Sequence, residues 1–184
     1  MDTDIIIKNI QIEFFFPIIR DKIRNLRLTT SDEIIVYLPT YSPSNLIKII
    51  NKLTVKKRWT IFSLDAKKKE KIFGVNVEPL SEDIFLKKFA SCYGIVCAGG
   101  FATTSEAIFL GKPMIVVPVE GQIEQQFNAA ALKQEGVTVI DKFSDKNINI
   151  ISNWISSPRV LEIKYEDESK KIVKTILEDY SNLN

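Results

Sequence analysis

Strand-length apolar runs alternate with amphipathic stretches along most of this chain of 184 residues, and this alternation limits the possible folds more than any other feature. Ile34–Leu38 is a continuous apolar run, which is typical of a strand buried on both faces of a sheet. The chain after Pro43 has apolar residues three or four apart, which indicates a helix that covers one face. Repeated strand–helix units predict an α/β fold with a mostly parallel sheet between two layers of helices.

The same criteria predict six strands and seven helices along the chain. The predicted strands span residues 34–38, 59–64, 75–77, 95–98, 114–117 and 137–140. Five of the predicted helices span 18–26, 43–53, 124–134, 145–155 and 166–180. Another begins at 81, and one more follows the two glycines at 99 and 100 and ends near 110. Between the second and third strands, 67–71 is predicted to be a solvated, charged turn. Ser42 is a possible N-cap for Pro43 at the first helical position.

Composition excludes several classes of function. The 25 basic and 23 acidic residues leave a formal charge of +2, too little for generic nucleic-acid binding. The chain has no His, so the commonest general base and metal ligand must be replaced by other groups in any reaction. The two cysteines form neither a disulfide framework nor a zinc pattern, which favours the reducing cytoplasm. The apolar run of residues 5–19 contains charged residues and predicts neither a signal peptide nor a membrane span.

Gly99 and Gly100 follow a predicted strand and precede a predicted helix. Ligands of open parallel sheets bind at the carboxyl ends of the strands, and a helix that starts there favours anions. The pair predicts a phosphate-binding turn, and a plain tight turn explains it about equally well. The sequence shows neither a dinucleotide fingerprint nor a P-loop at this turn.

Three further places at the same sheet edge carry polar side chains. Glu106 lies about one helical turn after Thr103, where it can accept hydrogen bonds from a vicinal diol or remain a solvated carboxylate. Residues 118–129 bring carboxamides and carboxylates that can bind sugar hydroxyls or start a polar helix. Thr40 lies in the loop after the first strand, where its hydroxyl can contact a phosphate, although capping of the next helix is the simpler role.

Three segments taken together, Cys97–Ala107, Leu110–Pro113 and Val117–Ala129, resemble the donor-binding half of GT-B glycosyltransferases in order and spacing. The resemblance implies a three-layer Rossmann-like domain, one half of a GT-B fold, over residues 18–184. It implies that residues 1–17 are a linker or interface segment of a missing N-terminal domain. The motifs cover about residues 95–136, and the order of strands and helices extends the resemblance from residue 18 to the end.

The resemblance also implies roles for individual residues. The residues that would line the diphosphate of a nucleotide sugar are Gly99, Gly100, Phe101, Ala102 and Thr103. Glu106 would hold the ribose hydroxyls, and the backbone near Pro79 and Leu80 would hold the base. The residues that would face the donor sugar are Glu124, Gln125 and Gln126, with Asn128 supporting that helix start. Ala98 stands where some relatives have a His, so one diphosphate contact is absent.

The implied function is donor binding in an inverting, metal-independent glycosyltransferase that uses a UDP-sugar as substrate and needs no cofactor. The general base and the acceptor site would lie in the missing domain, so the catalytic residues are unknown and the chain alone would transfer poorly. Two alternatives remain: a donor subunit whose partner chain supplies the acceptor domain, and a non-enzymatic ligand-binding module. The protein is predicted to be cytoplasmic, with membrane association only through the acceptor domain or a partner, and the apolar N-terminal segment permits a homo-oligomer.

Overall fold

The computed structural model describes residues 14–181, with the side chains of residues 179–181 left undescribed. Contacts along the chain divide it into two compact units. The larger unit spans residues 19–164, and the smaller one combines the described residues up to 18 with those from 165 onward. Each unit is described by itself.

The larger unit contains a seven-stranded sheet within its described residues, in the order β3-β4-β2-β1-β5-β6-β7. Every neighbouring pair is parallel except β3 and β4, which are antiparallel. The strands are β1 (Glu33–Tyr37), β2 (Arg58–Ser63), β3 (Glu70–Ile72), β4 (Val75–Pro79), β5 (Gly94–Cys97), β6 (Met114–Val116) and β7 (Thr138–Val139). The carboxyl ends of the parallel strands therefore lie at one edge, which we call the carboxyl edge, and their starts lie at the opposite, amino edge.

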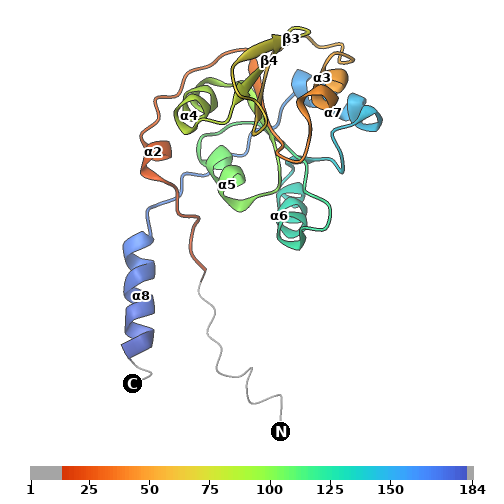
Figure 1. The fold of residues 1–184 in the computed structure, drawn as a ribbon. Helices are drawn as coiled ribbons and strands as arrows, with labels where there is room; N and C mark the ends of the chain where they lie inside the picture. Colours follow the sequence, from red (N-terminus) through yellow and green to blue (C-terminus); the bar gives the residue numbers. More distant parts are fainter. Residues whose placement is uncertain (1–13, 182–184) are drawn as a thin grey trace. The chain divides into compact units, whose positions relative to one another are not determined.

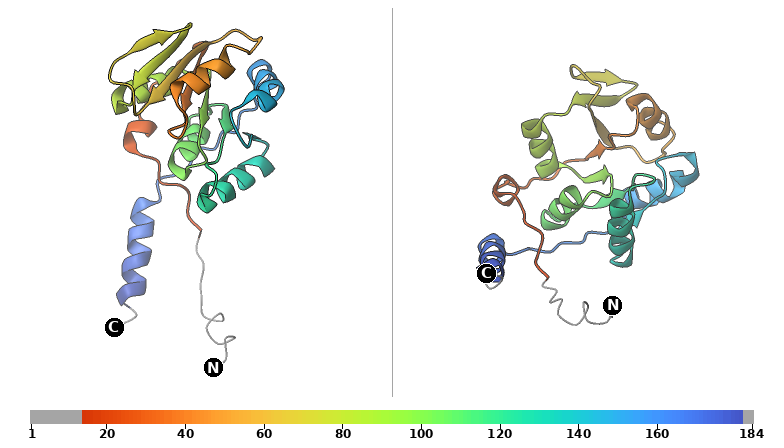
Figure 2. Two further views of the ribbon diagram at one scale, coloured as in Figure 1. Left: turned by 45° about the vertical axis from the view of Figure 1, so that its right-hand side comes forward. Right: turned by 60° about the horizontal axis from the view of Figure 1, so that its bottom comes forward.

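Helices cover both faces of this sheet. They are α2 (Asp21–Arg24), α3 (Pro43–Ile50), α4 (Glu82–Ser91), α5 (Phe101–Phe109), α6 (Ile123–Gln134) and α7 (Ile148–Ser156), with a 3-10 turn η1 (Asp145–Asn147) before α7. Figures 1 and 2 show α3 and α7 side by side, and their apolar residues share one core cluster with alternate residues of the sheet, such as Ile34 and Val36. Tyr37 points to the other face, where its ring lies 5.8 Å from the ring of Phe85 in α4. The α/β fold class is confirmed.

Local sequence signals explain several element boundaries. The Ser42 hydroxyl accepts a hydrogen bond from the Asn45 N–H, and Pro43 occupies the first turn of α3, as predicted. Gly111 and Gly136 follow the ends of α5 and α6 with φ of 60° and 82°, a conformation that other residues rarely adopt. These glycines end the helices and direct the chain into the next strands.

The sequence missed one strand and overestimated three helices, one of which is α3, which ends at Ile50 rather than at 53. Residues 67–71 were predicted as a turn, but Glu70–Ile72 pairs with β4 as an edge strand. Its short polar sequence has no apolar alternation to indicate a strand. The helix predicted over 18–26 spans only Asp21–Arg24, and the last predicted helix begins at Ser169 rather than 166.

The smaller unit contains α8 (Ser169–Ser181) and the described residues before Ile19. The Phe16 ring lies 5.7 Å from the Tyr165 ring, and the Phe16 N–H donates to Glu168 Oε2 at 2.8 Å. The contacts group residues 165–181 with the N-terminal segment, and their predicted place in the Rossmann-like domain stays a prediction. Residues 1–13 of the predicted interface segment lie outside the described part, and its role stays a prediction. Within residues 14–181, no helix combines the length and apolarity needed to cross a bilayer.

Candidate functional site

The Gly99–Gly100 turn connects β5 to α5 at the carboxyl edge. Gly100 is the N-cap residue of α5, with φ of −68° and ψ of 136°, and no side chain caps the helix. The N–H groups of a first helical turn have no acceptor inside the helix, and together with the helix dipole they favour an anion. A Cβ atom placed on Gly100 would meet no atom within 4 Å, so space remains open beside this helix start.

Gly99 is fixed by two side chains of α6. Its N–H donates to Gln125 Oε1 at 3.2 Å, and its carbonyl accepts from Asn128 Nδ2 at 3.0 Å. Gln125 Oε1 also accepts from the N–H of Val119 at 3.1 Å, so one carboxamide joins the loops after β5 and β6. These hydrogen bonds fix the Gly99–Gly100 turn against the start of α6.

The structure brings the predicted diphosphate and sugar residues together at this edge. Phe101 and Ala102 are exposed at the start of α5, and Thr103 is half-buried. Glu124 and Gln126 are exposed in the first turn of α6, whereas Gln125 is half-buried and bonded to the loops. The side chain of Gln125 therefore holds the turn together with Asn128, which was predicted to support the start of α6, and the predicted sugar contact of Gln125 stays a prediction.

Glu106 lies in the second turn of α5, and its side chain is only 6% exposed. Both carboxylate oxygens accept hydrogen bonds from Arg20: Oε1 from Nε at 2.7 Å and Oε2 from Nη2 at 3.1 Å. These bonds raise the pKa of Arg20 above its ordinary value. Sequence reasoning missed Arg20, because 86 positions separate it from Glu106 and no local motif links them.

A second carboxylate extends the ion pairs of Arg20 to the start of α4. Arg20 Nη1 lies 2.9 Å from Glu82 Oε1, and Lys22 Nζ lies 2.7 Å from Glu82 Oε2. The hydrogen bond from Lys22 holds the pKa of Glu82 below its ordinary value. Arg20 therefore connects α4, which follows the predicted base-binding residues, to α5, which follows the predicted diphosphate turn.

The remaining predicted residues lie at the same edge, at the end of a strand or in the loops that follow. Pro79 ends β4 and is half-buried, and Leu80 is exposed before α4. Thr40 is exposed in the loop between β1 and α3. No group of three or more Cys, Asp or Glu among residues 14–181 has a metal-binding arrangement.

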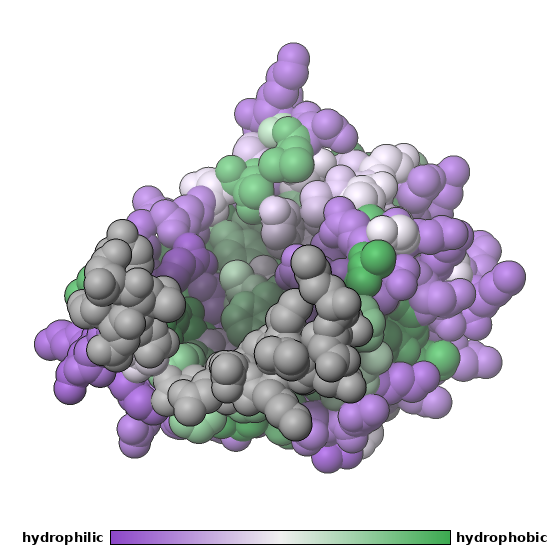
Figure 3. Space-filling model, turned by 90° about the horizontal axis from the view of Figure 1, so that it is seen from below, coloured by the Kyte–Doolittle hydropathy of each residue, from purple (hydrophilic) through white to green (hydrophobic). Residues whose placement is uncertain are grey.

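Large apolar side chains are exposed beside the Gly99–Gly100 turn. Phe101 begins α5, and Ile123 and Phe127 lie in the first half of α6. The space-filling view from below shows apolar residues at the surface among polar ones (Figure 3). Exposed apolar residues gathered near polar ones mark surfaces that bind a ligand or another protein.

The mostly parallel sheet, with a glycine turn leading into an uncapped helix, defines an α/β protein whose carboxyl edge has a helix start of the kind that favours anions. A comparison with protein families extends this assignment: the model for glycosyl transferase family 1 matches residues 4–158. The chain therefore belongs to glycosyl transferase family 1, and the recognition of a glycosyltransferase domain from sequence is confirmed. No match was found among the curated proteins.

Solved glycosyltransferases resemble the chain at low sequence identity. Spinosyn forosaminyltransferase SpnP is 15% identical, with a TM-score of 0.49, over 88% of this chain and 48% of that one. Glycosyltransferase SnogD from Streptomyces nogalater is 12% identical, with a TM-score of 0.45, over 90% and 47%. Spinosyn rhamnosyltransferase SpnG, complexed with thymidine diphosphate, is 17% identical, with a TM-score of 0.41, over 71% and 43%. The chain thus spans less than half the length of each.

Proposed function

We propose that this domain binds the nucleoside diphosphate of a sugar donor at its carboxyl edge, as the donor half of an inverting glycosyltransferase. The observation that carries the proposal is the uncapped start of α5 at Gly100, with open space where a Cβ would stand. An approaching diphosphate would meet backbone N–H groups and the positive end of the helix dipole. Membership of glycosyl transferase family 1 supports a sugar donor as the source of that diphosphate.

The same helix start would supply the electrostatic part of the reaction. When the bond between the sugar and the diphosphate breaks, negative charge grows on the leaving diphosphate. The N–H groups of Phe101, Ala102 and Thr103 would stabilise this charge, so that the reaction needs no metal ion and no cofactor. Glu124 and Gln126, exposed on the neighbouring α6, would contact the sugar hydroxyls.

The nucleoside would extend from the α5 start toward α4. Glu106 would accept hydrogen bonds from the ribose hydroxyls, which requires Arg20 to share or release the two carboxylate oxygens that it now holds. The backbone at Pro79 and Leu80 would hold the base. In this arrangement Arg20 occupies the ribose position until the donor binds.

Another domain or subunit would supply the acceptor site and the general base. The sequence contains no His, the commonest base in such reactions, and Phe101, Ile123 and Phe127 leave an apolar surface for a covering partner. That partner would be an N-terminal domain of the same polypeptide or a separate subunit. Co-purification of the full-length gene product would distinguish the two arrangements, because only a separate subunit appears as a second band.

Isothermal titration of the purified chain with UDP, GDP and thymidine diphosphate tests donor binding. Gly100→Val places a side chain in the open space beside the α5 start, and a nucleotide that binds there should lose at least about tenfold in affinity. Ala131→Val, an exposed substitution further along α6, serves as the matched control and should leave affinity unchanged. Equal affinity of both variants and the wild type would remove the α5 start from the site.

A further inference from the structure

The β3–β4 hairpin carries a large aromatic side chain at its tip. β3 is the outermost strand at one end of the described sheet, and Phe73 and Gly74 form the turn that joins it to β4 (Figure 1). Since β4 runs parallel to its neighbour β2, this turn lies at the amino edge of the sheet, opposite the Gly99–Gly100 turn. None of the proposed donor contacts lies there.

The fold does not explain the conformation and the exposure of Phe73. Its φ is 46°, in the left-handed region, where Gly, Asn and Asp are favoured and a bulky residue is uncommon. The residue is 83% exposed, so packing within the protein offsets little of this strain. Phe73 therefore contributes little to stability, and its ring is accessible to another molecule.

Basic residues are concentrated around this hairpin. Residues 55–75 contain seven Lys or Arg and two acidic residues, which gives this stretch a formal charge of +5. The remaining residues must then carry −3 to give the +2 of the whole chain. The hairpin is thus part of a basic region in a chain whose other residues are net acidic, and such a region attracts anionic surfaces.

Three lysines lie close to Phe73. Lys56 and Lys57, in the loop before β2, line one small depression together with Phe73. Lys71 of β3 comes two residues before Phe73 and is exposed. The Lys57 ammonium lies 3.7 Å from the centroid of the Tyr93 ring, and none of the three ammonium groups has a carboxylate within ion-pair distance among residues 14–181. The protein therefore leaves their charge unneutralised.

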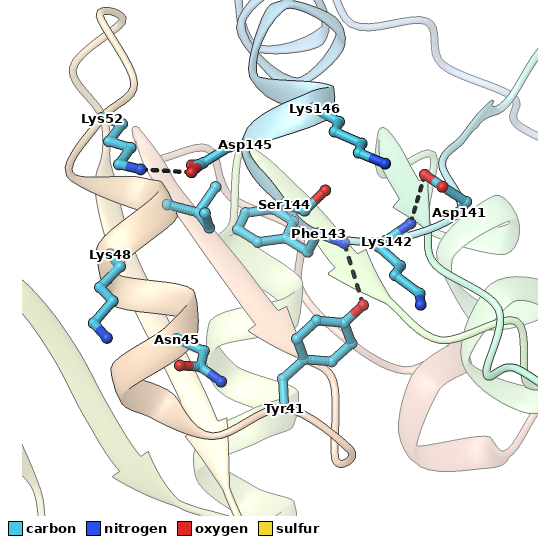
Figure 4. Close-up of a pocket in the computed structure, with 11 residues that line it drawn as sticks. Tyr41, Asn45, Lys48, Lys52, Asp141, Lys142, Phe143, Ser144, Asp145 and Lys146 are labelled. Carbon is cyan, nitrogen blue, oxygen red and sulfur yellow. Dashed lines mark hydrogen bonds and ion pairs between the residues drawn. The ribbon is translucent and has the colours of Figure 1, made fainter.

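The groove between α3 and residues 141–146 shows the opposite arrangement, because both signs of charge line it (Figure 4). Lys52 Nζ lies 2.6 Å from Asp145 Oδ2, and Lys146 points toward Asp141. This groove balances much of its own charge, whereas the hairpin tip does not.

An anionic membrane surface fits the groups at the hairpin tip. Anionic headgroups attract lysines wherever these lie near the surface, so the ammonium groups need not converge on one phosphate. An exposed aromatic ring can enter the boundary between headgroups and acyl chains, where aromatic side chains are favoured. Lysines on an edge strand also prevent pairing with another chain, but this explains Lys71 and neither Phe73 nor Lys56.

We propose that the β3–β4 hairpin docks the domain on an anionic lipid membrane. The ring of Phe73 enters the interfacial region, and Lys56, Lys57 and Lys71 lie at the headgroups. Either signal alone binds weakly, and the two together give a reversible attachment. Because the tip lies at the amino edge, the bound domain would keep its carboxyl edge away from the lipid. The proposal does not depend on donor binding.

Co-sedimentation of the purified chain with vesicles tests the docking. Vesicles that contain phosphatidylglycerol should bind the wild type, and vesicles of phosphatidylcholine alone should bind it at least about tenfold more weakly. Phe73→Asn introduces a residue that the turn favours, so the fold should tolerate it while binding falls at least about fivefold. Phe14→Ser is the matched control, because Phe14 is 89% exposed in the smaller unit. It should leave binding within about twofold, and a loss as large as that in Phe73→Asn would overturn the proposal.

A pair of double variants tests the lysines. Lys56→Gln with Lys71→Gln should weaken binding to the anionic vesicles at least about tenfold, since each lysine near the surface adds to the attraction. Lys133→Gln with Lys146→Gln removes the same charge from exposed positions of α6 and η1 and should leave binding within about twofold. An equal loss in both would show that net charge alone drives binding, which would contradict docking through the hairpin.

Tryptophan fluorescence reports whether the ring enters the lipid. The native tryptophans, Trp59 and Trp154, are buried, so wild-type emission should not change when anionic vesicles are added. Phe73→Trp should retain binding, and its emission should shift to shorter wavelength as the indole enters the interface. The proposal is wrong if the wild type does not bind, if Phe73→Trp shows no shift, or if binding depends on the lysines but not on Phe73. Thermal unfolding of each variant confirms that it is folded.

Discussion

The two edges of the parallel sheet differ in whether the polar groups beside its central strands have partners within the protein. At the amino edge, the buried Glu33 carboxylate accepts hydrogen bonds from Lys88 at 2.8 and 2.9 Å and from the Thr60 hydroxyl at 2.6 Å. Lys112, also buried, donates to the carbonyl of Cys92 at 3.1 Å. The protein itself satisfies these groups, and burial of unpaired charge would cost several kcal/mol (about 3–5).

At the carboxyl edge, several polar groups are left for other molecules. The first turn of α5 has no capping side chain, and Glu124 and Gln126 are exposed at the start of α6. Even the buried Glu106 pairs with an arginine whose side chain is 49% exposed and so can move into solvent. From this comparison we infer that these polar groups at the amino edge stabilise the fold, and the proposed donor binding falls to the carboxyl edge.

Lys88→Met should cause the largest loss of stability. The Lys88 and Glu33 side chains are only 18% and 7% exposed, so removal of the ammonium leaves a buried carboxylate without a cation. The free energy of unfolding should fall by about 3 kcal/mol. Urea denaturation measures it, with Lys52→Met as the control, because the exposed Lys52–Asp145 pair should contribute less than about 1 kcal/mol. Similar losses in the two variants would contradict the conclusion that the buried ion pair at the amino edge stabilises the fold.

Gly99→Ala should be the next most disruptive change, although it lies at the carboxyl edge. An added Cβ would stand 2.7 Å from the carbonyl oxygen of Gln125, and this backbone atom cannot move without shifting α6. We expect a loss of about 1–3 kcal/mol. Gly100→Ala is the matched control: its Cβ meets nothing within 4 Å, so stability should change by less than about 0.5 kcal/mol. Equal effects would mean that both glycines are only turn residues.

Much of this arrangement could be predicted from the sequence because it depends on local patterns. Continuous apolar runs identified six of the strands, and Ser42 and Pro43 marked the start of α3. The predicted diphosphate turn does join β5 to α5, because glycines between a buried strand and a helix leave few other conformations. The fold could be predicted because each apolar run, helix cap and glycine turn is a pattern of residues within about ten positions of each other.

The contacts that determine the partners of the polar side chains at the carboxyl edge join residues that are far apart in the sequence. Arg20 reaches Glu106 across 86 positions, and Lys52, just after α3, pairs with Asp145 across 93. Gln125 was predicted to face a sugar, yet its carboxamide oxygen accepts from Gly99, 26 positions away. A charged or amide residue in a helix has many possible partners, and only the packing of distant elements selects one.

Stability at low pH tests the amino edge with a smaller expected effect. Burial alone would raise the pKa of Glu33, but the hydrogen bonds from Lys88 and Thr60 outweigh it and hold this pKa below its ordinary value. A carboxylate with a lowered pKa stabilises the folded state above its unfolded pKa, about 4.3, and loses that contribution as the pH falls through its folded value. The stability difference between wild type and Glu33→Gln should therefore be full at pH 7 and shrink below about pH 4.5. A difference that is constant from pH 7 to pH 3 would show that Glu33 is not ionised in the fold.

The smallest expected effect concerns Arg20 at the carboxyl edge. If Glu106 accepts the ribose hydroxyls, Arg20 and the nucleotide compete for the same two oxygens, because Arg20 occupies both. Arg20→Gln removes the stronger, charge-assisted donor and should tighten nucleoside diphosphate binding by a few-fold, about 1 kcal/mol or less. Titration with the tightest of the three nucleotides measures this change.

Glu106→Gln in the Arg20→Gln background completes the test, because the two variants differ only in the carboxylate and leave no arginine facing an amide. The double variant should bind the nucleotide more weakly than Arg20→Gln, since a neutral amide accepts weaker hydrogen bonds than a carboxylate. Uridine without phosphate should show the same order of affinities, whereas pyrophosphate should not distinguish the variants. Equal nucleotide affinity in Arg20→Gln and the double variant would make the Arg20–Glu106 pair structural, like Lys88–Glu33, and the difference between the two edges would then rest on the α5 start alone.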